Sequence, residues 1–170
     1  HTAIDVDAGA GAVLRLDQLE HGVAPEAIGV HLVARSCRVG RDASVTWATG
    51  LLGGTLVRHA TRGELLGAGG ELNLGGATVA DGRRQAHHLI RVYHRVGAAR
   101  SRQDFKTLAR DRALASFDGL IHVDPGADDT DALQQCNNLQ LDPGARVAVR
   151  PQLDIHTDEG LSALELVMTR

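Results

Sequence analysis

The sequence predicts an all-β fold built from short stacked strands, and three observations support this prediction. Hydrophobic residues make up 43% of the 170 residues but aromatic residues only 2%, so the core must consist of small aliphatic side chains. Short runs alternate apolar and polar residues with a period of two, which is typical of strands with one buried face. Turn sequences rich in glycine, proline and aspartate separate these runs.

The alternating runs recur along most of the chain. Their apolar positions are Val45 and Trp47, then Leu72 and Leu74, then Ile90, Val92 and Val96, then Ile121 and Val123, and finally Val147, Val149, Leu153 and Ile155. Turns are expected at residues 7–10, 40–43, 67–70, 75–76, 124–127 and 142–145. No linker or low-complexity tract divides the chain, so we expect a single β core.

The clearest internal repeat is Asp-Pro-Gly-Ala, which occurs at residues 124–127 and again 18 residues later at 142–145. A period near 20 residues predicts one coil of a β-solenoid, in which each coil stacks on the last. An antiparallel β-sandwich would produce the same alternation and the same regular turns. Periodicity therefore leaves both folds open.

The last segment changes its period. Leu161, Leu164, Val167 and Met168 have helical spacing after Asp158, a residue type that often caps helices. The sequence thus predicts a β core over residues 1–157 and a short amphipathic C-terminal helical segment over residues 158–170.

Charge and cysteine content restrict the partners. Eighteen Lys and Arg against 21 Asp and Glu give a net charge of −3, which provides no basic field for nucleic acid or an anionic membrane. No run approaches the roughly 20 apolar residues that span a bilayer. Cys37 and Cys136 form no C-x-x-C pair. A reduced, cytoplasmic compartment is the simpler interpretation, and one long-range disulfide is compatible with the spacing.

The sequence lacks the common catalytic signatures, namely the phosphate-binding loop, the serine nucleophile elbow and the His-Glu-x-x-His zinc motif. The densest histidine group is His87, His88 and His94, of which a strand would turn His87 away from the other two. Structural or surface histidines are the simpler interpretation, and a metal-binding or enzymatic solenoid that uses this face is the alternative.

Cys136 is the most informative candidate. A strand here would place Cys136 with Gln134 and Asn138 on a polar face, where a thiol can ionise. The same parity continues to Asp154 and His156. These three residue types on one side of neighbouring strands would suit iron or zinc. The alternative is a solvated face with an incidental cysteine.

The second half of the chain resembles a known family. Residues 101–109, 115–123, 127–141 and 150–155 are similar to the SufB/SufD family of iron–sulfur cluster assembly scaffolds. The motifs are Phe-x-Gly-x-Ile-x-Val, Thr-Asp-Ala-x-Gln and Pro-Gln-Leu-Asp-Ile, and residues 63–70 resemble a glycine-rich family turn more weakly. This resemblance implies a right-handed parallel β-helix, which favours the solenoid over the sandwich.

The resemblance also implies a function and partners. It implies a non-enzymatic scaffold in a complex of SufB, SufD and the ATPase SufC, in which SufB and SufD pair through their β-helices. A transient iron–sulfur cluster would assemble near that interface. We expect a SufB/SufD-type partner or a second copy of this chain at a β-helix end. A SufC-type ATPase is a further expected partner, although the family's helical docking regions have no counterpart in this sequence.

The resemblance assigns site residues as well. Cys136 lies where the SufB branch has its sulfur-accepting, cluster-associated cysteine, whereas the neighbouring motifs look more like the SufD branch. An ungapped register places Glu165 at the cluster-associated glutamate, while a gapped one makes residues 160–168 the start of a helix. Cys136 is thus the expected cluster-binding residue, and Cys136, Glu165 and His156 are the expected metal ligands. A structural relic without metal is the remaining alternative.

Overall fold

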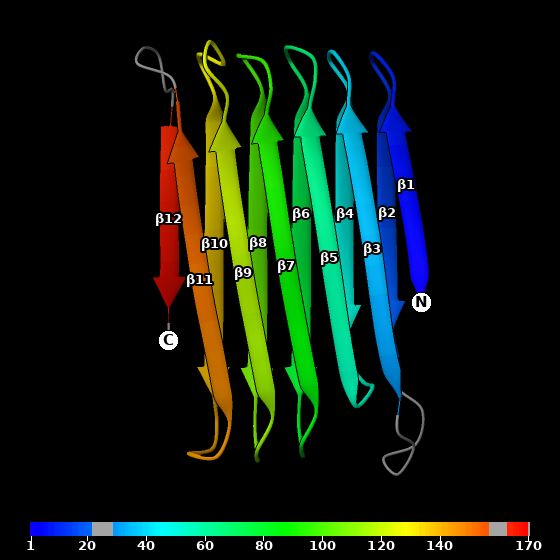
Figure 1. Ribbon diagram of the computed structural model, residues 1–170, viewed down its shortest axis with the longest axis vertical. Helices are drawn as coiled ribbons and strands as arrows, with labels where there is room; N and C mark the ends of the chain where they lie inside the picture. The colour runs from blue at the N-terminus through cyan, green and yellow to red at the C-terminus, as the bar shows by residue number, and fades with distance from the viewer. Residues whose placement is uncertain (22–28, 157–162, 170) are drawn as a thin grey trace.

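The computed structural model consists of two parallel β-sheets of six strands each, stacked face to face (Figure 1). It describes residues 1–21 and 29–156 and the backbone of residues 163–169. Every strand pairing in these ranges is parallel. The chain therefore forms a β-solenoid, as the resemblance implied, and the antiparallel sandwich is excluded.

Successive strands alternate between the two sheets, so each coil contributes one strand to each sheet. The first sheet contains β1 (Thr2–Ala8), β3 (Val30–Val39), β5 (Leu56–Leu65), β7 (Gln85–His94), β9 (Leu114–Val123) and β11 (Arg146–Ile155). The second contains β2 (Val13–Glu20), β4 (Ser44–Leu51), β6 (Glu71–Ala80), β8 (Arg100–Ala109), β10 (Asp131–Gln140) and β12 (Ala163–Thr169). Figure 1 shows the described N-terminal and C-terminal strands at opposite edges of the stack.

The coil is longer than the sequence repeat suggested. One full coil separates each residue from its register partner in the same sheet, as between Val30 and Leu56. The coil that joins Leu114 to its partner Arg146 is longer still, so the length is not constant. The short period expected from the repeat is therefore wrong. The two Asp-Pro-Gly-Ala turns join β9 to β10 and β10 to β11, so they mark the two ends of a single strand rather than successive coils.

Aliphatic side chains make up much of the interior, as the composition predicted, but buried histidine, glutamine and arginine side chains share it. Burial alternates along the strands, with every second residue inward. Trp47, Phe105 and Phe117 are the large aromatic rings of the core, and the centroids of the two phenylalanines lie 4.9 Å apart. Buried alanines occupy the corners between strands, each at most 2% exposed: Ala43, Ala99, Ala113, Ala127 and Ala145. A larger residue at such a corner would have to push two strands apart.

The C-terminal segment is a strand where a helix was expected. Residues 163–169 form β12, which pairs with β10 from the match of Asp131 with Ala163 onward. The predicted helix is wrong for these residues. A short isolated helix is marginal in water, whereas the edge of β10 offers hydrogen-bond partners to the whole segment. Residues 157–162 and 170, and with them the expected boundary at 157/158, lie outside the described residues.

One expected turn is also wrong. Gly75 and Gly76 lie in the middle of β6, whereas the turn at residues 67–70 is present. A Cβ atom at Gly76 would collide with the ring of Phe105, so the glycine makes room for that ring inside the solenoid. Within the described ranges, no helix has the length and apolarity that a bilayer crossing requires.

Candidate functional site

The interior of the solenoid contains Cys136, contrary to the expectation of a solvated face. Its exposed fraction is only 2%, and Ala132 and Gln134 of the same strand are buried with it. Leu139, which the pattern would place inside, is 53% exposed. The alternation of β10 was therefore correct, but the buried and exposed faces are reversed.

The Cys136 thiol lies in the apolar core of the solenoid. Cys136 belongs to the same core cluster as Phe105 and Phe117. Burial, and to a lesser extent the nearby charge of Asp104, raises the pKa of this thiol to about 12. The thiol is therefore protonated at neutral pH and cannot act as a thiolate ligand in this conformation.

Cys37 is a second buried thiol and shares this property. Its exposed fraction is 1%, and burial together with the charge of Asp7 raises its pKa to about 11. Both cysteines are free, so the long-range disulfide that the spacing allowed is not formed. Cys37 therefore provides a matched comparison for any chemistry at Cys136.

Two glutamines lie side by side in the same interior. Gln103 of β8 is the register partner of Gln134 of β10, and each is 1% exposed. Among the described residues, neither side-chain amide has a hydrogen-bond partner. Buried amides normally find partners, often ordered water, because an unsatisfied one costs about 1–3 kcal/mol. The interior near Cys136 thus contains both unpartnered amides and the aromatic side chains of the core cluster.

The motif Phe-x-Gly-x-Ile-x-Val contributes directly to this interior. Phe117, Ile121 and Val123 of β9 all point inward and are at most 3% exposed. A Cβ atom on Gly119 would overlap the Gln134 amide nitrogen. The glycine of the motif is therefore required because the Gln134 side chain occupies the space above it.

A buried cation lies at the other end of the interior, and no sequence pattern predicted it. Arg35 is 5% exposed, and its guanidinium donates hydrogen bonds to Thr61 at 3.0 Å, Thr49 at 2.6 Å and Gln18 at 3.4 Å. Burial lowers the pKa of Arg35 to about 10, although the charge of Glu20 opposes the shift. Arg35 therefore stays charged at neutral pH and links the two sheets through hydrogen bonds.

The three clustered histidines do not form one site. This confirms the prediction that a strand turns His87 away from His88 and His94. His88 and His94 are buried and form hydrogen bonds with Thr78 and Ser101 respectively. His87 points outward and lies 2.7 Å from the Ser116 hydroxyl. Burial lowers the pKa of His88 to about 3 and that of His94 to about 4, so both rings are neutral at pH 7. The alternative of a single histidine-rich metal face loses its geometric basis.

His156 lies on the outer face of the first sheet, directly after β11. Its Nε2 atom is 3.0 Å from Asp154, and Asp154 is 2.8 Å from the Nδ1 atom of His122. The sequence pattern named Asp154 and His156 but missed His122. His122 is the register partner of Asp154, one coil earlier. To find His122 from the sequence, the length of the coil from β9 to β11 would have to be known.

The expected ligands Cys136 and His156 are thus not assembled around one point. The Cys136 side chain lies inside the solenoid, whereas His156 lies on its surface. Glu165 lies on β12, where its backbone is in register with Leu133, and its side chain is outside the described residues.

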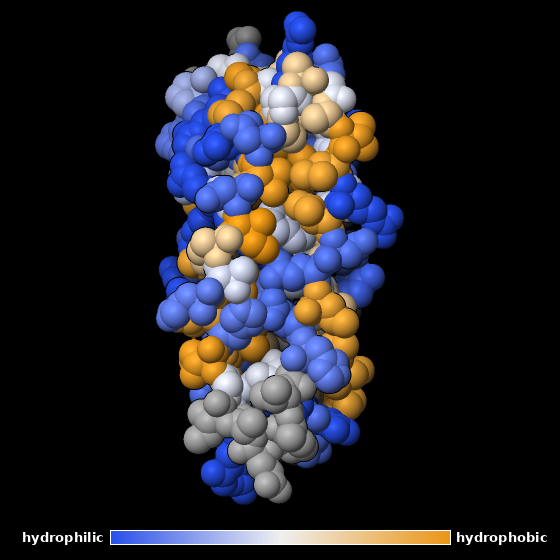
Figure 2. Space-filling model, turned by 90° about the vertical axis from the view of Figure 1, so that its right-hand side faces the viewer, coloured by the Kyte–Doolittle hydropathy of each residue, from blue (hydrophilic) through white to orange (hydrophobic). Residues whose placement is uncertain are grey.

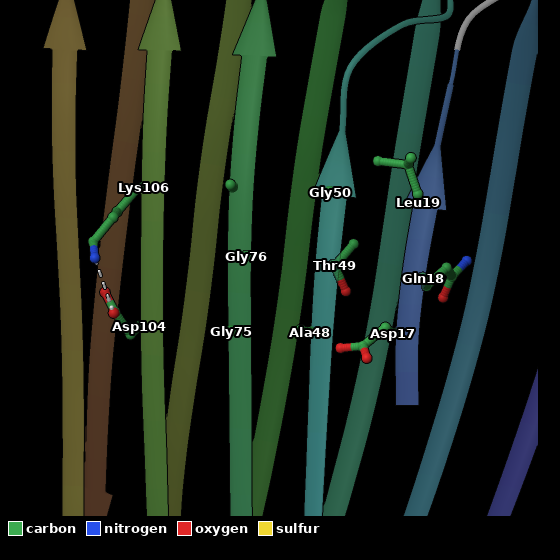
Figure 3. A pocket seen from close by; sticks show the side chains of 11 residues that line it. Asp17, Gln18, Leu19, Ala48, Thr49, Gly50, Gly75, Gly76, Asp104 and Lys106 are labelled. Atoms are coloured by element: carbon green, nitrogen blue, oxygen red, sulfur yellow. Dashed lines mark ion pairs between the residues drawn. The ribbon is translucent and has the colours of Figure 1, made fainter. Parts of the chain in front are cut away.

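A shallow groove crosses the outer face of the second sheet (Figure 3). Its volume is about 490 Å³, and it forms where Gly50 of β4 and Gly75 of β6 have no side chains to fill the space. Leu19 borders it on one side, and the ion pair between Asp104 and Lys106, 3.3 Å long, borders it on the other. The described lining contains neither histidine nor cysteine, so we assign no chemistry to this groove.

Comparison with known proteins places this architecture in a family. Residues 1–161 match the family model described as SUF system FeS cluster assembly, SufBD core domain. The chain is 31% identical over 129 residues to the iron–sulfur cluster assembly protein SufD of Escherichia coli, covering 76% of this chain and 30% of that protein. It is 33% identical over 141 residues to an iron–sulfur cluster assembly SufBD family protein of Mycobacterium bovis, covering 79% of this chain and 36% of the relative.

A SufBD family protein of Mycobacterium leprae is similar at 30% identity over 141 residues, with the same coverage. The chain spans about a third of the length of the curated relatives that it matches. The similarity therefore concerns the solenoid core of these proteins.

Proposed function

Because the chain belongs to the SufBD family of the SUF iron–sulfur cluster assembly system, we propose that it acts as a scaffold component in cluster assembly and not as an enzyme. The observation that carries this proposal is the family match over residues 1–161, which includes all strands from β1 to β11. A stack of parallel coils fits this role, because each coil supports the next.

The ends of the solenoid are the expected docking surfaces. In this chain β1 and β2 are edge strands at one end, and β11 and β12 are edge strands at the other. Edge strands present backbone groups that a partner strand can pair with. Figure 2 shows hydrophobic side chains gathered over the N-terminal end, where Ile4, Val6, Leu14 and Leu16 are only partly buried. A SufB/SufD-type partner or a second copy of this chain would cover such an end.

A SufC-type ATPase is a partner of the complete assembly in this proposal. The described residues form the core domain alone, so we assign no ATPase contact to a particular strand.

Cluster binding requires the Cys136 thiol to become accessible. Cys136 is in register with Met168 of β12, the last strand of the second sheet. We infer that Cys136 coordinates a transient cluster only after β12 moves away from β10, for example when a partner strand competes for that edge. Glu165 of β12 would change position in the same movement, so Cys136 and Glu165 are the proposed cluster-proximal residues.

Anaerobic reconstitution with ferrous iron and sulfide tests this function. The scaffold proposal predicts visible charge-transfer absorption that Cys136→Ser diminishes, whereas Cys37→Ser, at an equally buried thiol, leaves it unchanged. Equal loss in both variants would indicate unfolding rather than ligation, which far-ultraviolet circular dichroism detects. Absorption that is unaffected by Cys136→Ser would overturn the assignment of Cys136.

A sedimentation experiment tests the docking surfaces separately. We expect self-association at high micromolar concentration, or binding to a SufB/SufD-type partner at lower concentration. Replacing Val6 and Leu14 at the N-terminal end with lysine should abolish the association if that end is used. A monodisperse monomer that also fails to bind a SufB/SufD-type partner would contradict the docking proposal.

A further inference from the structure

Four polar side chains form a two-by-two array on the outer face of the first sheet. His122 and Asp154 are register partners on β9 and β11. Asp124 and His156 follow them by two residues, and side chains two residues apart share one face of a strand. The backbone ladder continues this far, because the His156 amide donates a hydrogen bond to the Val123 carbonyl. Histidine and aspartate therefore alternate around the array.

Three members of this array converge. The carboxylate of Asp154 lies 2.8 Å from His122 Nδ1 through one oxygen and 3.0 Å from His156 Nε2 through the other. One nitrogen from each ring and one oxygen of Asp154 all lie within 4.8 Å of one another. The two rings are tilted by 51° with centroids 5.1 Å apart, so they do not stack flat against each other.

The fourth member fixes the orientation of His122. Asp124 lies 2.9 Å from His122 Nε2, and Arg95 holds the Asp124 carboxylate with hydrogen bonds of 3.1 and 3.0 Å. Tyr93 packs against the other side of the ring, with a centroid distance of 5.6 Å. A carboxylate that binds the far nitrogen of a histidine is the common support of metal-binding histidines.

The spacing of these donor atoms suits a shared metal ion. His122 Nδ1 lies 2.8 Å from one Asp154 oxygen, and His156 Nε2 lies 3.0 Å from the other. Two neighbouring ligand atoms that each lie about 2.0–2.2 Å from one metal ion are separated by roughly the same distance. Without a metal ion the same contacts are hydrogen bonds between the rings and the carboxylate.

We propose that His122, Asp154 and His156 bind one divalent first-row transition metal ion, and that Asp124 and Arg95 are positioning residues for this site. Two imidazole nitrogens and one carboxylate suit Fe²⁺, Co²⁺ or Zn²⁺ better than Mg²⁺ or Ca²⁺, which prefer oxygen ligands alone. The side chains of Asp154 and His156 are about half exposed, at 49% and 51%, so water can fill the remaining coordination positions. This site is independent of the proposed cluster site, because Cys136 lies inside the solenoid.

Titration of the 170-residue chain, without an affinity tag, with Co²⁺ tests the proposal. We expect one equivalent to bind, with visible d–d absorption that reports nitrogen and oxygen ligands. His122→Gln and Asp154→Asn should each weaken binding by more than about tenfold, and Asp124→Asn by about 10–100-fold with a shifted absorption spectrum. All these positions lie on the outer face, and circular dichroism verifies that each variant is folded.

Matched controls separate this site from other chelating groups. His87→Gln removes a histidine on the same outer face whose Nδ1 lies 2.7 Å from the Ser116 hydroxyl, and it should leave the affinity unchanged. His1→Ala removes the histidine next to the terminal amine, and Cys136→Ser removes the proposed cluster ligand. Neither variant should change the affinity for Co²⁺. If the triple variant with His122→Gln, Asp154→Asn and His156→Gln binds Co²⁺ as tightly as the original chain, or if the original chain binds none, the proposal is wrong.

Discussion

The guanidinium of Arg35 donates a hydrogen bond of 2.6 Å to the Thr49 hydroxyl across the interior of the solenoid. Arg35 belongs to β3 of the first sheet and Thr49 to β4 of the second, so this bond ties the two sheets together inside one coil. The Arg35 guanidinium also lies 5.0 Å from the Trp47 ring centroid. Such a buried cation is tolerated only because its donors find acceptors.

Replacing Arg35 therefore tests the importance of this link. Arg35→Leu should lower the free energy of unfolding by about 1–3 kcal/mol, because it leaves the Thr49, Thr61 and Gln18 side chains without their buried donor. Urea denaturation measures the change. Arg58→Leu, at an exposed position on the next strand of the same sheet, should change the free energy by less than about 0.5 kcal/mol. Equal stability of both variants would mean that the buried network contributes nothing.

Buried neutral histidines should make the fold sensitive to acid. Burial, together with the charges of Arg35 and His31, lowers the pKa of His59 from 6.5 to about 3. The folded pKa lies below the unfolded value, so the neutral ring stabilises the fold fully above about pH 6.5. Between pH 6.5 and 3 the unfolded chain binds more protons, so the stability falls as the pH falls.

The effect is measurable between pH 7.5 and pH 5. Each histidine with so low a pKa should cost up to about 2 kcal/mol at pH 5, since a shift of one pKa unit corresponds to about 1.4 kcal/mol. His59→Leu should reduce the pH dependence of the urea midpoint, whereas His87→Leu on the outer face should reduce it less. Glu20, which lies 3.8 Å from His59, is the nearby acid that would oppose the effect. An unchanged slope in His59→Leu would contradict the burial argument.

The two cysteines should react slowly until the fold opens. Burial raises the pKa of both thiols to about 11 or 12, so alkylation at pH 8 should be at least about 100-fold slower than in the unfolded chain. Deletion of residues 163–170 removes β12 from the edge of β10, so it should accelerate the labelling of Cys136 and leave that of Cys37 unchanged. Mass spectrometry of the labelled peptides distinguishes the two sites. Equal acceleration at both would indicate global unfolding and would contradict a specific role for β12.

Gly119 and Gln134 should be energetically coupled. Gly119→Ala should destabilise the fold by about 1–3 kcal/mol, because the new methyl group would collide with the Gln134 amide. In a Gln134→Ala background the same change should cost less by at least about 0.5 kcal/mol, since the obstructing side chain is gone. A double-mutant cycle in urea measures this coupling. Strictly additive effects would mean that Phe117, the other neighbour of the added methyl group, causes the strain.

Local patterns in the chain were sufficient to predict the class of fold and the family. Strict alternation, small aliphatic residues and regular turns required stacked strands, because a side chain that alternates between two faces can be buried on only one of them. The motifs around Phe117, Gln134 and Pro151 then separated the solenoid from the sandwich. All of these features lie within short segments, so neighbouring residues reveal them.

The folded arrangement was needed to establish which face is inside and which residues meet. Parity places Cys136 with Gln134, but the interior of this solenoid accepts glutamine and histidine, so polarity did not identify the outer face. The contact between His122 and Asp154 depends on the length of the coil between them, which varies from turn to turn and leaves no periodic mark in the sequence. Hydrogen-bond register between coils sets both relationships, and register is a property of the assembled sheet rather than of any single segment.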